Sequence, residues 1–217
     1  MRSRVRRILF PGHPGLKHSG QHAAQAIVPN FTPDVAPIIG EMLDHRSRGR
    51  FGTLPMADGS VYWYALWNSK QQTPSDTVSL LRWLRYDREE WHPAVGDLLS
   101  ATDPQRIHVR ETASLAKPLA SLASGRVALL GDAAHALTPD LGQGASQAFE
   151  DATALIDALR TSPHDIPAAL RLYEKARRAR TAKMLRFSRL TGQLSSLRGF
   201  PGVARDALMR LMPPMPA

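Results

Sequence analysis

The residues best suited to chemistry lie between positions 126 and 146 of the 217-residue chain. An apolar run closes with Gly131 and Asp132, and a glycine-rich segment, Gly142-Gln143-Gly144, follows shortly after. The Asp132 carboxylate accepts hydrogen bonds and repels phosphates, so it suits a ligand that carries hydroxyl groups. Backbone amides at a helix start lack intrahelical partners and lie at the positive end of the helix dipole. This corner therefore favours an anion, or a carbonyl that becomes anionic.

A strand and a helix must position these residues. The run RVALLG (126–131) is typical of a buried strand, which places Asp132 at the strand's carboxyl end, where ligands of α/β proteins bind. A helix is predicted to start within a few residues of Gly142. Apolar residues then recur at helical spacing: Ala145, Ala148, Phe149, Ala152, Leu155, Ile156 and Leu159.

The ligand that combines a polyol with a ring that gains negative charge on reduction is a flavin nucleotide, FAD or FMN. The alternative is a purely structural strand–turn–helix, with a left-handed glycine and Asp140 as a cap. Gly-Asp, a proline and Gly-Gln-Gly occur together within this short stretch, and their conjunction favours the flavin.

The remainder of the chain predicts a mixture of helices and strands. Asp58-Gly59 is a turn dipeptide between β-prone runs, so 50–68 is predicted to be a β-hairpin. Residues 30–49 are predicted to be irregular or partly helical. The other predicted elements are a short helix in 1–10 that ends at Pro11, strands at 20–28 and 106–112, helices at 76–86 and 92–101, and a long basic helix after Pro167 with Leu170, Tyr173, Ala176, Met184, Phe187 and Leu190 on its apolar side.

Composition excludes several functions. The chain has no cysteine, so disulfides, thiolate metal sites and cysteine nucleophiles are excluded, and no serine–histidine–aspartate triad or metal cluster is recognisable. No apolar run approaches transmembrane length and no signal peptide is evident, so we expect a cytoplasmic protein. The net charge of +9 raises nucleic-acid binding as an alternative. The arginines of 171–189 share a helix with apolar residues, however, so we expect a solvated helix face and no nucleic-acid partner.

One stretch of the chain resembles a known family. GRVALLGDAAHALTPDLGQGASQAFEDATAL (125–155) resembles the second flavin-binding motif of the para-hydroxybenzoate hydroxylase-like, single-component FAD-dependent monooxygenases. The resemblance implies that Asp132 holds the ribityl chain. Ser146 stands where the family often has asparagine, and His135 is expected to be a turn histidine bonded to backbone. The cofactor-binding residues implied around the ring and ribityl chain are Gly131, Asp132, Pro139, Gly142, Gln143, Gly144, Ala145 and Ser146.

The amino-terminal segment matches only part of that family's pattern. Members open with a strand and Gly-x-Gly-x-x-Gly, which binds the FAD pyrophosphate, and this chain contains no such motif. Met1 to Arg6 fit the family's middle motif from its third position onward. The resemblance therefore implies a carboxyl-terminal part of a monooxygenase that starts inside this motif, and makes Arg2 and Arg6 candidates for contacts near the pyrophosphate and NAD(P)H. The alternative is a solvated basic terminus.

The resemblance also implies a fold. We expect an α/β (α+β) architecture with a partial, glutathione-reductase-like Rossmann layer for FAD, an antiparallel substrate-domain sheet and long carboxyl-terminal helices. In that sheet, Tyr62 and Tyr64 would line the substrate pocket or simply pack. The implied divisions are 1–15 for the remainder of the middle motif, 16–115 for the β-rich substrate domain, 116–160 for the FAD-binding part and 161–217 for the carboxyl-terminal helices.

The implied function is FAD-dependent monooxygenation, in which NAD(P)H reduces the flavin and O₂ hydroxylates an aromatic or other small organic substrate. Catalytic residues stay unassigned, and no metal is expected. The alternative is a non-catalytic remnant or docking module that does not hold FAD by itself. We expect the 217-residue chain alone to bind FAD weakly or not at all. A homo-oligomer and a missing amino-terminal half are the partners left open.

Overall fold

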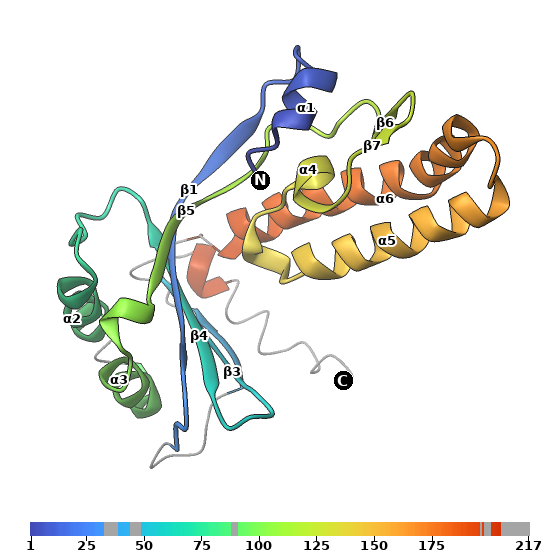
Figure 1. Cartoon of the computed structure of the whole chain (residues 1–217). Coiled ribbons are helices and arrows are strands. Elements are labelled where there is room, and N and C mark those ends of the chain that lie inside the picture. Colours follow the sequence, from blue (N-terminus) through green and yellow to red (C-terminus); the bar gives the residue numbers. More distant parts are fainter. Residues whose placement is uncertain (33–38, 44–48, 88–90, 196, 198–200, 205–217) are drawn as a thin grey trace. The chain divides into compact units, whose positions relative to one another are not determined.

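A computed structural model describes the chain except for residues 33–38, 44–48, 88–90, 196, 198–200 and 205–217 (Figure 1). The chain divides into two compact units. One combines Met1–Ser19 with Thr112–Leu194, and the other combines Gly20–Glu111 with Ser195–Ala217. We call them the helical unit and the sheet unit and describe each by itself. Strands β1 (Leu16–Val28) and β5 (His108–Leu115) continue from one unit into the other.

The sheet unit is built on antiparallel strands. The strand order is β2-β3-β4-β1-β5, with β2 at Gly40–Leu43, β3 at Arg50–Pro55 and β4 at Val61–Asn68. β3 and β4 form the predicted hairpin, and its turn is closed by Asp58, whose carboxylate accepts hydrogen bonds from the backbone amide and hydroxyl of Ser60. The predicted strand 20–28 is also confirmed, although β1 begins earlier, at Leu16. Tail residues 205–217, predicted to fray at their end, lie outside the described residues.

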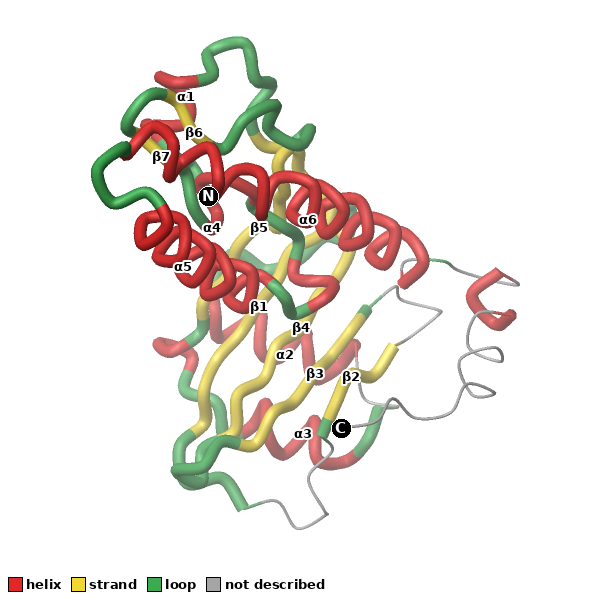
Figure 2. Tube along the Cα trace, turned by 90° about the vertical axis from the view of Figure 1, so that its right-hand side faces the viewer, coloured by secondary structure: helices red, strands yellow, loops and turns green. Residues whose placement is uncertain are grey.

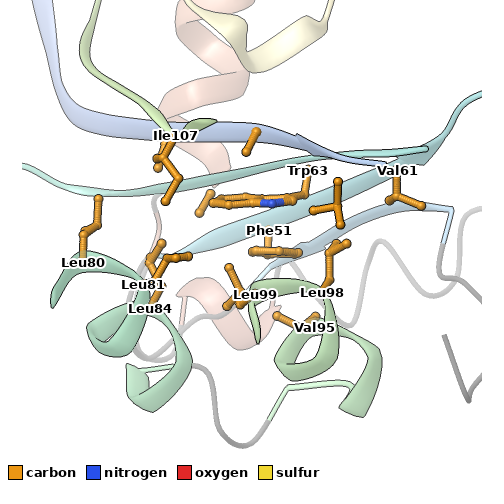
Figure 3. Close-up of a cluster of buried hydrophobic side chains, with 14 of the residues drawn as sticks. Phe51, Val61, Trp63, Leu80, Leu81, Leu84, Val95, Leu98, Leu99 and Ile107 are labelled. Atoms are coloured by element: carbon orange, nitrogen blue, oxygen red, sulfur yellow. The ribbon is translucent and has the colours of Figure 1, made fainter. Parts of the chain in front are cut away.

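Two helices cover one face of this sheet. They are α2 (Thr77–Asp87) and α3 (Pro93–Ser100), both predicted from the sequence, and a 3₁₀ turn at Pro104–Arg106 follows. Side chains alternate along a strand, so every second residue of β4 enters the core between sheet and helices. Figure 3 shows the centre of this core, where the rings of Phe51 and Trp63 stack with their centroids 5.6 Å apart. This sheet is the antiparallel layer that the resemblance implied.

The helical unit packs around its two longest helices. Its elements are α1 (Arg4–Leu9), β6 (Ala123–Ser124), β7 (Val127–Ala128), α4 (Gly131–His135), a 3₁₀ turn (Pro139–Leu141), α5 (Gly144–Thr161) and α6 (Ile166–Ser195, whose last residue falls in the other unit). α5 and α6 lie side by side (Figures 1 and 2). The Tyr173 hydroxyl of α6 donates to the Leu129 carbonyl at 2.9 Å inside the core, which ties α6 to the segment before α4. No helix in the described part of the chain is both long and apolar enough to cross a bilayer.

The predicted strand at 126–131 is wrong in its extent. Only Val127 and Ala128 form a strand, paired with Ser124 and Ala123, and Gly131 already begins α4. Residues form a strand only where an adjacent strand pairs with them through backbone hydrogen bonds. Among the described residues the ladder ends with the Leu129 amide, which donates to the Leu122 carbonyl at 2.8 Å. The apolar run therefore gives a two-residue strand and a short extended segment.

The predicted inner face of α5 is also wrong in part. The helix buries Gln147, Asp151 and Ala158, while Phe149 and Ile156 are 74% and 49% exposed. Polar residues can enter a core when they satisfy one another, and apolar periodicity does not reveal such a core. The segment 30–49, predicted to be irregular or partly helical, contains β2. Its residues 33–38 and 44–48 lie outside the described chain.

Candidate functional site

The turn at Gly131 is fixed from two sides. Its backbone has a φ of +51°, in the left-handed region that favours glycine. Its amide donates to Oδ2 of Asp151 at 2.8 Å. A Cβ atom at this position would lie 3.3 Å from Cβ of Ala148, so α4 begins close against α5. A glycine therefore lets the chain turn sharply next to the first turns of α5.

Asp151 is the centre of a buried polar network in the helical unit. Its side chain is fully buried and accepts hydrogen bonds from the Gly131 amide, from Nε2 of His135 at 2.6 Å and from Nε of Arg177 at 2.7 Å. Burial by itself would raise the pKa of Asp151. The hydrogen bonds from His135, Gly131 and Arg177 outweigh burial and hold this pKa below its usual value. The carboxylate thus stays ionised and joins α4, α5 and α6.

Arg177 completes the network from α6. Its guanidinium also donates to Glu150 at 2.5 Å, and to the backbone and side-chain oxygens of Gln147 at 3.1 Å and 2.9 Å. Burial would lower the pKa of Arg177, but the bonds to Asp151 and Glu150 raise it above its usual value. We predicted a solvated face for the basic part of this helix, and that is wrong for Arg177. A buried cation is stable here because its carboxylate partners and hydrogen bonds compensate its desolvation.

Asp132 lies in the first turn of α4, directly after the fixed glycine. Its side chain is 54% exposed, and the α-ammonium group of Met1 lies 3.4 Å from its Oδ2. Acidic side chains are favoured in the first turn of a helix. The Asp132 carboxylate is therefore exposed, while the turn that carries it is held by the buried Asp151 through the Gly131 amide.

The two amino-terminal arginines differ sharply. Arg6 of α1 is buried, and Nη1 donates to the carbonyls of Asp132 and Ala133, both at 3.0 Å. These carbonyls belong to the short helix α4, and the last four carbonyls of a helix have no partner within the helix. Burial lowers the pKa of Arg6. Arg2 is exposed and has no hydrogen bond among the described residues. Arg6 therefore supports the backbone of the Asp132 turn, and its predicted cofactor contact stays a prediction.

The glycine-rich corner is open. Pro139 begins the 3₁₀ turn, and Gly142 closes it with a φ of +62°. Nothing lies within 4 Å of a Cβ atom built at Gly142 or Gly144. Gln143 precedes α5 without a side-chain hydrogen bond that caps it, and residues 142–146 are all exposed. The first amides of α5 thus remain accessible, with space for another molecule above the two glycines.

The sequence analysis did not identify the buried residues that hold the Gly131-Asp132 turn. His135 was predicted to bond to backbone, and that is wrong, because its partner is the Asp151 carboxylate. Asp151 was given no role, although it lies in the motif at 125–155, and Arg177 was assigned only to a solvated helix face. The signal was an acidic residue within the apolar periodicity of α5, together with an arginine one turn after Tyr173, a core residue of α6. Each signal indicates a charged side chain on the inner face of its own helix, and neither identifies the partner.

Tyr62 and Tyr64 lie in the sheet unit, where their rings are 6.0 Å apart. The Tyr64 hydroxyl donates to Glu41 at 2.5 Å, and the Tyr62 hydroxyl donates to Gln25 at 3.3 Å. Burial, together with the bond to Glu41, raises the pKa of Tyr64 above its usual value. Both rings alternate with the core residues of β4, which places them on the sheet face away from α2 and α3. Their contact with a substrate stays a prediction.

Comparison with known proteins defines the class. The family model "FAD binding domain" matches residues 1–188, so the chain belongs to the FAD binding domain family. The fold agrees with that in a crystal structure of Klebsiella pneumoniae HpxO in complex with FAD and uric acid. The two share 28% identity with a TM-score of 0.83, over 95% of this chain and 52% of that one. The mixed fold of helices and antiparallel sheet is therefore that of the FAD-dependent monooxygenases.

Two relatives specify the resemblance further. The chain is 37% identical over 136 residues to an FAD-dependent urate hydroxylase of Mycolicibacterium vanbaalenii, which covers 63% of this chain and 34% of that protein. It is 32% identical over 220 residues to the 2-heptyl-3-hydroxy-4(1H)-quinolone synthase of Pseudomonas aeruginosa, which covers 98% of this chain and 55% of that protein. The chain thus spans between about a third and about half of the length of these relatives.

Proposed function

We propose that this chain forms part of an FAD-dependent monooxygenase that uses NAD(P)H and O₂ to hydroxylate a small organic substrate. The observation that carries the proposal is the pairing of an anchored Gly131-Asp132 turn with the open, glycine-lined start of α5. Membership of the FAD binding domain family, whose model spans residues 1–188, supports the same cofactor. Urate, quinolone and related substrates belong to the relatives, and for this chain we propose only a small organic molecule of aromatic type.

The chemistry of the corner fits part of FAD. The half-exposed carboxylate of Asp132 suits ribityl hydroxyls, and the exposed amides of residues 144–146 suit the electron-rich edge of the isoalloxazine ring. Pro139 and Gly142 to Ser146 would border that ring, and Gly131, whose Cβ position faces Ala148 of α5, would set the turn that carries Asp132. Arg2 is the more accessible candidate for the phosphates, since Arg6 is already bonded to α4. The chain contains no Gly-x-Gly-x-x-Gly, so its own residues fit the ring and ribityl chain better than the pyrophosphate.

Bound FAD would supply the redox chemistry that joins NAD(P)H to O₂. The chain's own residues would bind the cofactor and the substrate and orient them. Asp132 would hold ribityl hydroxyl groups, and the positive end of the α5 dipole would favour negative charge on the ring. Asp151, Arg177 and His135, which are buried, would keep the turn in place. Tyr62 and Tyr64 would offer rings and hydroxyls for a substrate on the sheet face away from α2 and α3.

The alternative is a non-catalytic remnant or docking module that does not hold FAD alone. The missing pyrophosphate motif and the exposed Phe149 and Ile156 on α5 support this alternative. Large exposed apolar side chains that lie together on a protein surface are often covered by another segment or another chain. The two proposals therefore differ in whether the 217 residues suffice for binding.

An FAD titration separates these proposals. Flavin fluorescence and absorbance are followed with the 217-residue chain, and with the product of its gene including any coding sequence upstream of Met1. Asp132→Ala should weaken binding by about 1.5–3 kcal/mol, because a charged hydrogen-bond acceptor is lost. Asp157→Ala, on the exposed side of α5, is the matched control. Equal affinity of wild type and Asp132→Ala refutes the ribityl role. Binding to the longer product alone supports the alternative, and binding to neither refutes the flavin proposal.

A further inference from the structure

A groove runs between α2 and α3 in the sheet unit, on residues that the proposed flavin site does not use. It has a volume of about 660 Å³, and those of its lining residues that the structure describes lie between Val78 and Pro104. One wall is a single face of α2, with Val78, Leu81, Arg82, Arg85 and Tyr86 at helical spacing. The volume falls in the range of about 300–1,000 Å³ typical of small-molecule sites.

The floor of the groove is apolar. Leu81, Val95 and Leu99 are buried and belong to the core against the sheet (Figure 3). Above them, Gly96 of α3 lines the groove, and nothing lies within 4 Å of a Cβ atom built at this glycine. A larger residue at position 96 would fill space that is now open. The groove therefore has a packed apolar floor and unoccupied space above that floor.

The walls supply positive charge and hydrogen-bond donors. Arg82 and Arg85 are exposed one turn apart on α2, and within the described part of the chain neither forms an ion pair or hydrogen bond. His92 accepts a hydrogen bond from the Ala94 amide through Nδ1, so the proton of its neutral ring is on Nε2. Among the lining residues that the structure describes, none is acidic. The donors are thus not neutralised by a carboxylate of the described lining.

Aromatic side chains stand beside these donors. Tyr86 is 79% exposed at the end of the arginine face, and the half-buried Trp91 contributes to both the groove and the core. Flat rings offer surfaces for another ring, and a pair of guanidinium groups offers the planar donors that a carboxylate accepts. A ligand that satisfies both would carry a negative charge on a flat apolar body.

We propose that the groove between α2 and α3 binds a small organic anion of this kind, an aromatic carboxylate. Its carboxylate lies against Arg82 and Arg85, and its ring lies over Leu99 and Gly96 between the aromatic side chains. The site does not depend on FAD, and none of its residues belongs to the proposed flavin corner.

The test uses 2-naphthoate as the probe and follows its fluorescence during titration of the 217-residue chain. We expect saturable binding that the double substitution Arg82→Gln/Arg85→Gln weakens by at least about tenfold, because both charged donors are lost. The neutral analogue 2-naphthamide should bind wild type weaker by a similar factor. The matched control is Arg160→Gln/Arg171→Gln, which removes two exposed charges from α5 and α6 and should leave affinity within about twofold.

A second variant, Gly96→Leu, fills the groove and keeps its charges. It should abolish binding while circular dichroism stays that of wild type, since leucine favours a helix more than glycine does. Unchanged affinity in the double arginine variant overturns the proposal, because the probe would then bind elsewhere, including at a substrate site of the proposed monooxygenase. If Gly96→Leu does not fold, the arginine pair and its control decide the outcome. Failure of FAD binding leaves this result unaffected.

Discussion

Arg177 of α6 donates through Nε to the Asp151 carboxylate of α5 at 2.7 Å, and both side chains are buried. The same carboxylate holds the Gly131 amide and the His135 ring, so one ion pair connects two long helices with the turn that carries Asp132. The turn is therefore positioned from inside the helical unit. This arrangement makes the proposed flavin corner sensitive to residues that never reach its surface.

Replacing Arg177 by methionine should strongly destabilise the chain. The change leaves Asp151 buried without its main cationic partner, and breaking a buried ion pair costs about 3–5 kcal/mol. The free energy of unfolding, measured by urea denaturation with circular dichroism, should fall by this amount. Arg160→Met is the control, since Arg160 is exposed and its ion pair with Asp157 has a separation of 3.9 Å. A loss equal to that of the control would show that the network contributes little.

The same network predicts acid sensitivity. The pKa of Asp151 in the folded chain is below its usual value of 3.8, despite burial, because of the hydrogen bonds that it accepts. The unfolded chain then binds a proton at this residue more readily than the folded chain. Its stabilising contribution is present above about pH 5 and is lost as the pH falls through 3.8 toward the lowered folded value. Urea denaturation at a series of pH values should show this loss.

Asp151→Asn identifies the source of that acid sensitivity. The variant should be less stable than wild type at pH 7, and its stability should fall less steeply below pH 5, because position 151 no longer titrates. Glu150 also has a lowered pKa, through Arg180 and Arg177, so Glu150→Gln serves as the comparison at a more exposed carboxylate. Equal acid slopes in wild type and Asp151→Asn would assign the sensitivity to other groups.

Local sequence signals predicted most of the elements. Asp58-Gly59 predicted the β3–β4 hairpin because its turn chemistry is local, and α5 begins at Gly144, close to the predicted position. The length of the strand at 127–128 was not predictable, because pairing depends on which chain lies beside it. The apolar run alone does not contain that information.

The sequence patterns also did not predict that the charged side chains of Asp151 and Arg177 are buried. Apolar spacing suggested that Phe149 faces the core, whereas α5 turns Asp151 inward toward Arg177. Each charge by itself is unfavourable inside a protein, and only the pair makes the burial acceptable. A partner on another helix cannot be identified by examining one helix at a time. Asp132 and Gly142 were singled out from the sequence because a Gly-Asp turn and a glycine-rich helix start are local signals, and their contacts with a cofactor stay predictions.

Gly131→Ala tests whether the turn needs glycine for both its dihedral angle and its contact. The left-handed conformation alone costs a residue with a Cβ atom roughly 1–2 kcal/mol. Gly125→Ala is a matched control, because Gly125 also has a left-handed φ, of +58°, but has nothing within 4 Å of an added Cβ atom. Gly131→Ala should lower the free energy of unfolding more than Gly125→Ala does. Equal losses would mean that Ala148 moves away at no measurable cost.

The last prediction concerns Gly52 and Tyr64, which face each other across β3 and β4. A Cβ atom at position 52 would lie 2.2 Å from Cζ of Tyr64, so the tyrosine ring covers the glycine. An aromatic ring packed across a strand glycine compensates for the missing side chain. Gly52→Ala should therefore displace the ring, break its hydrogen bond to Glu41 and destabilise the chain by about 1–3 kcal/mol.

A double-mutant cycle with Tyr64→Leu distinguishes this contact from a general effect of alanine in the strand. In the Tyr64→Leu background the ring and its hydroxyl are gone, so Gly52→Ala should cost much less or become stabilising, because alanine has a smaller entropic cost than glycine in a strand. The free energies of unfolding of the four proteins give the interaction energy. Additive losses would show that the ring does not depend on glycine at position 52. In that case Glu41, which accepts the hydrogen bond from the Tyr64 hydroxyl, would be the group that orients the tyrosine.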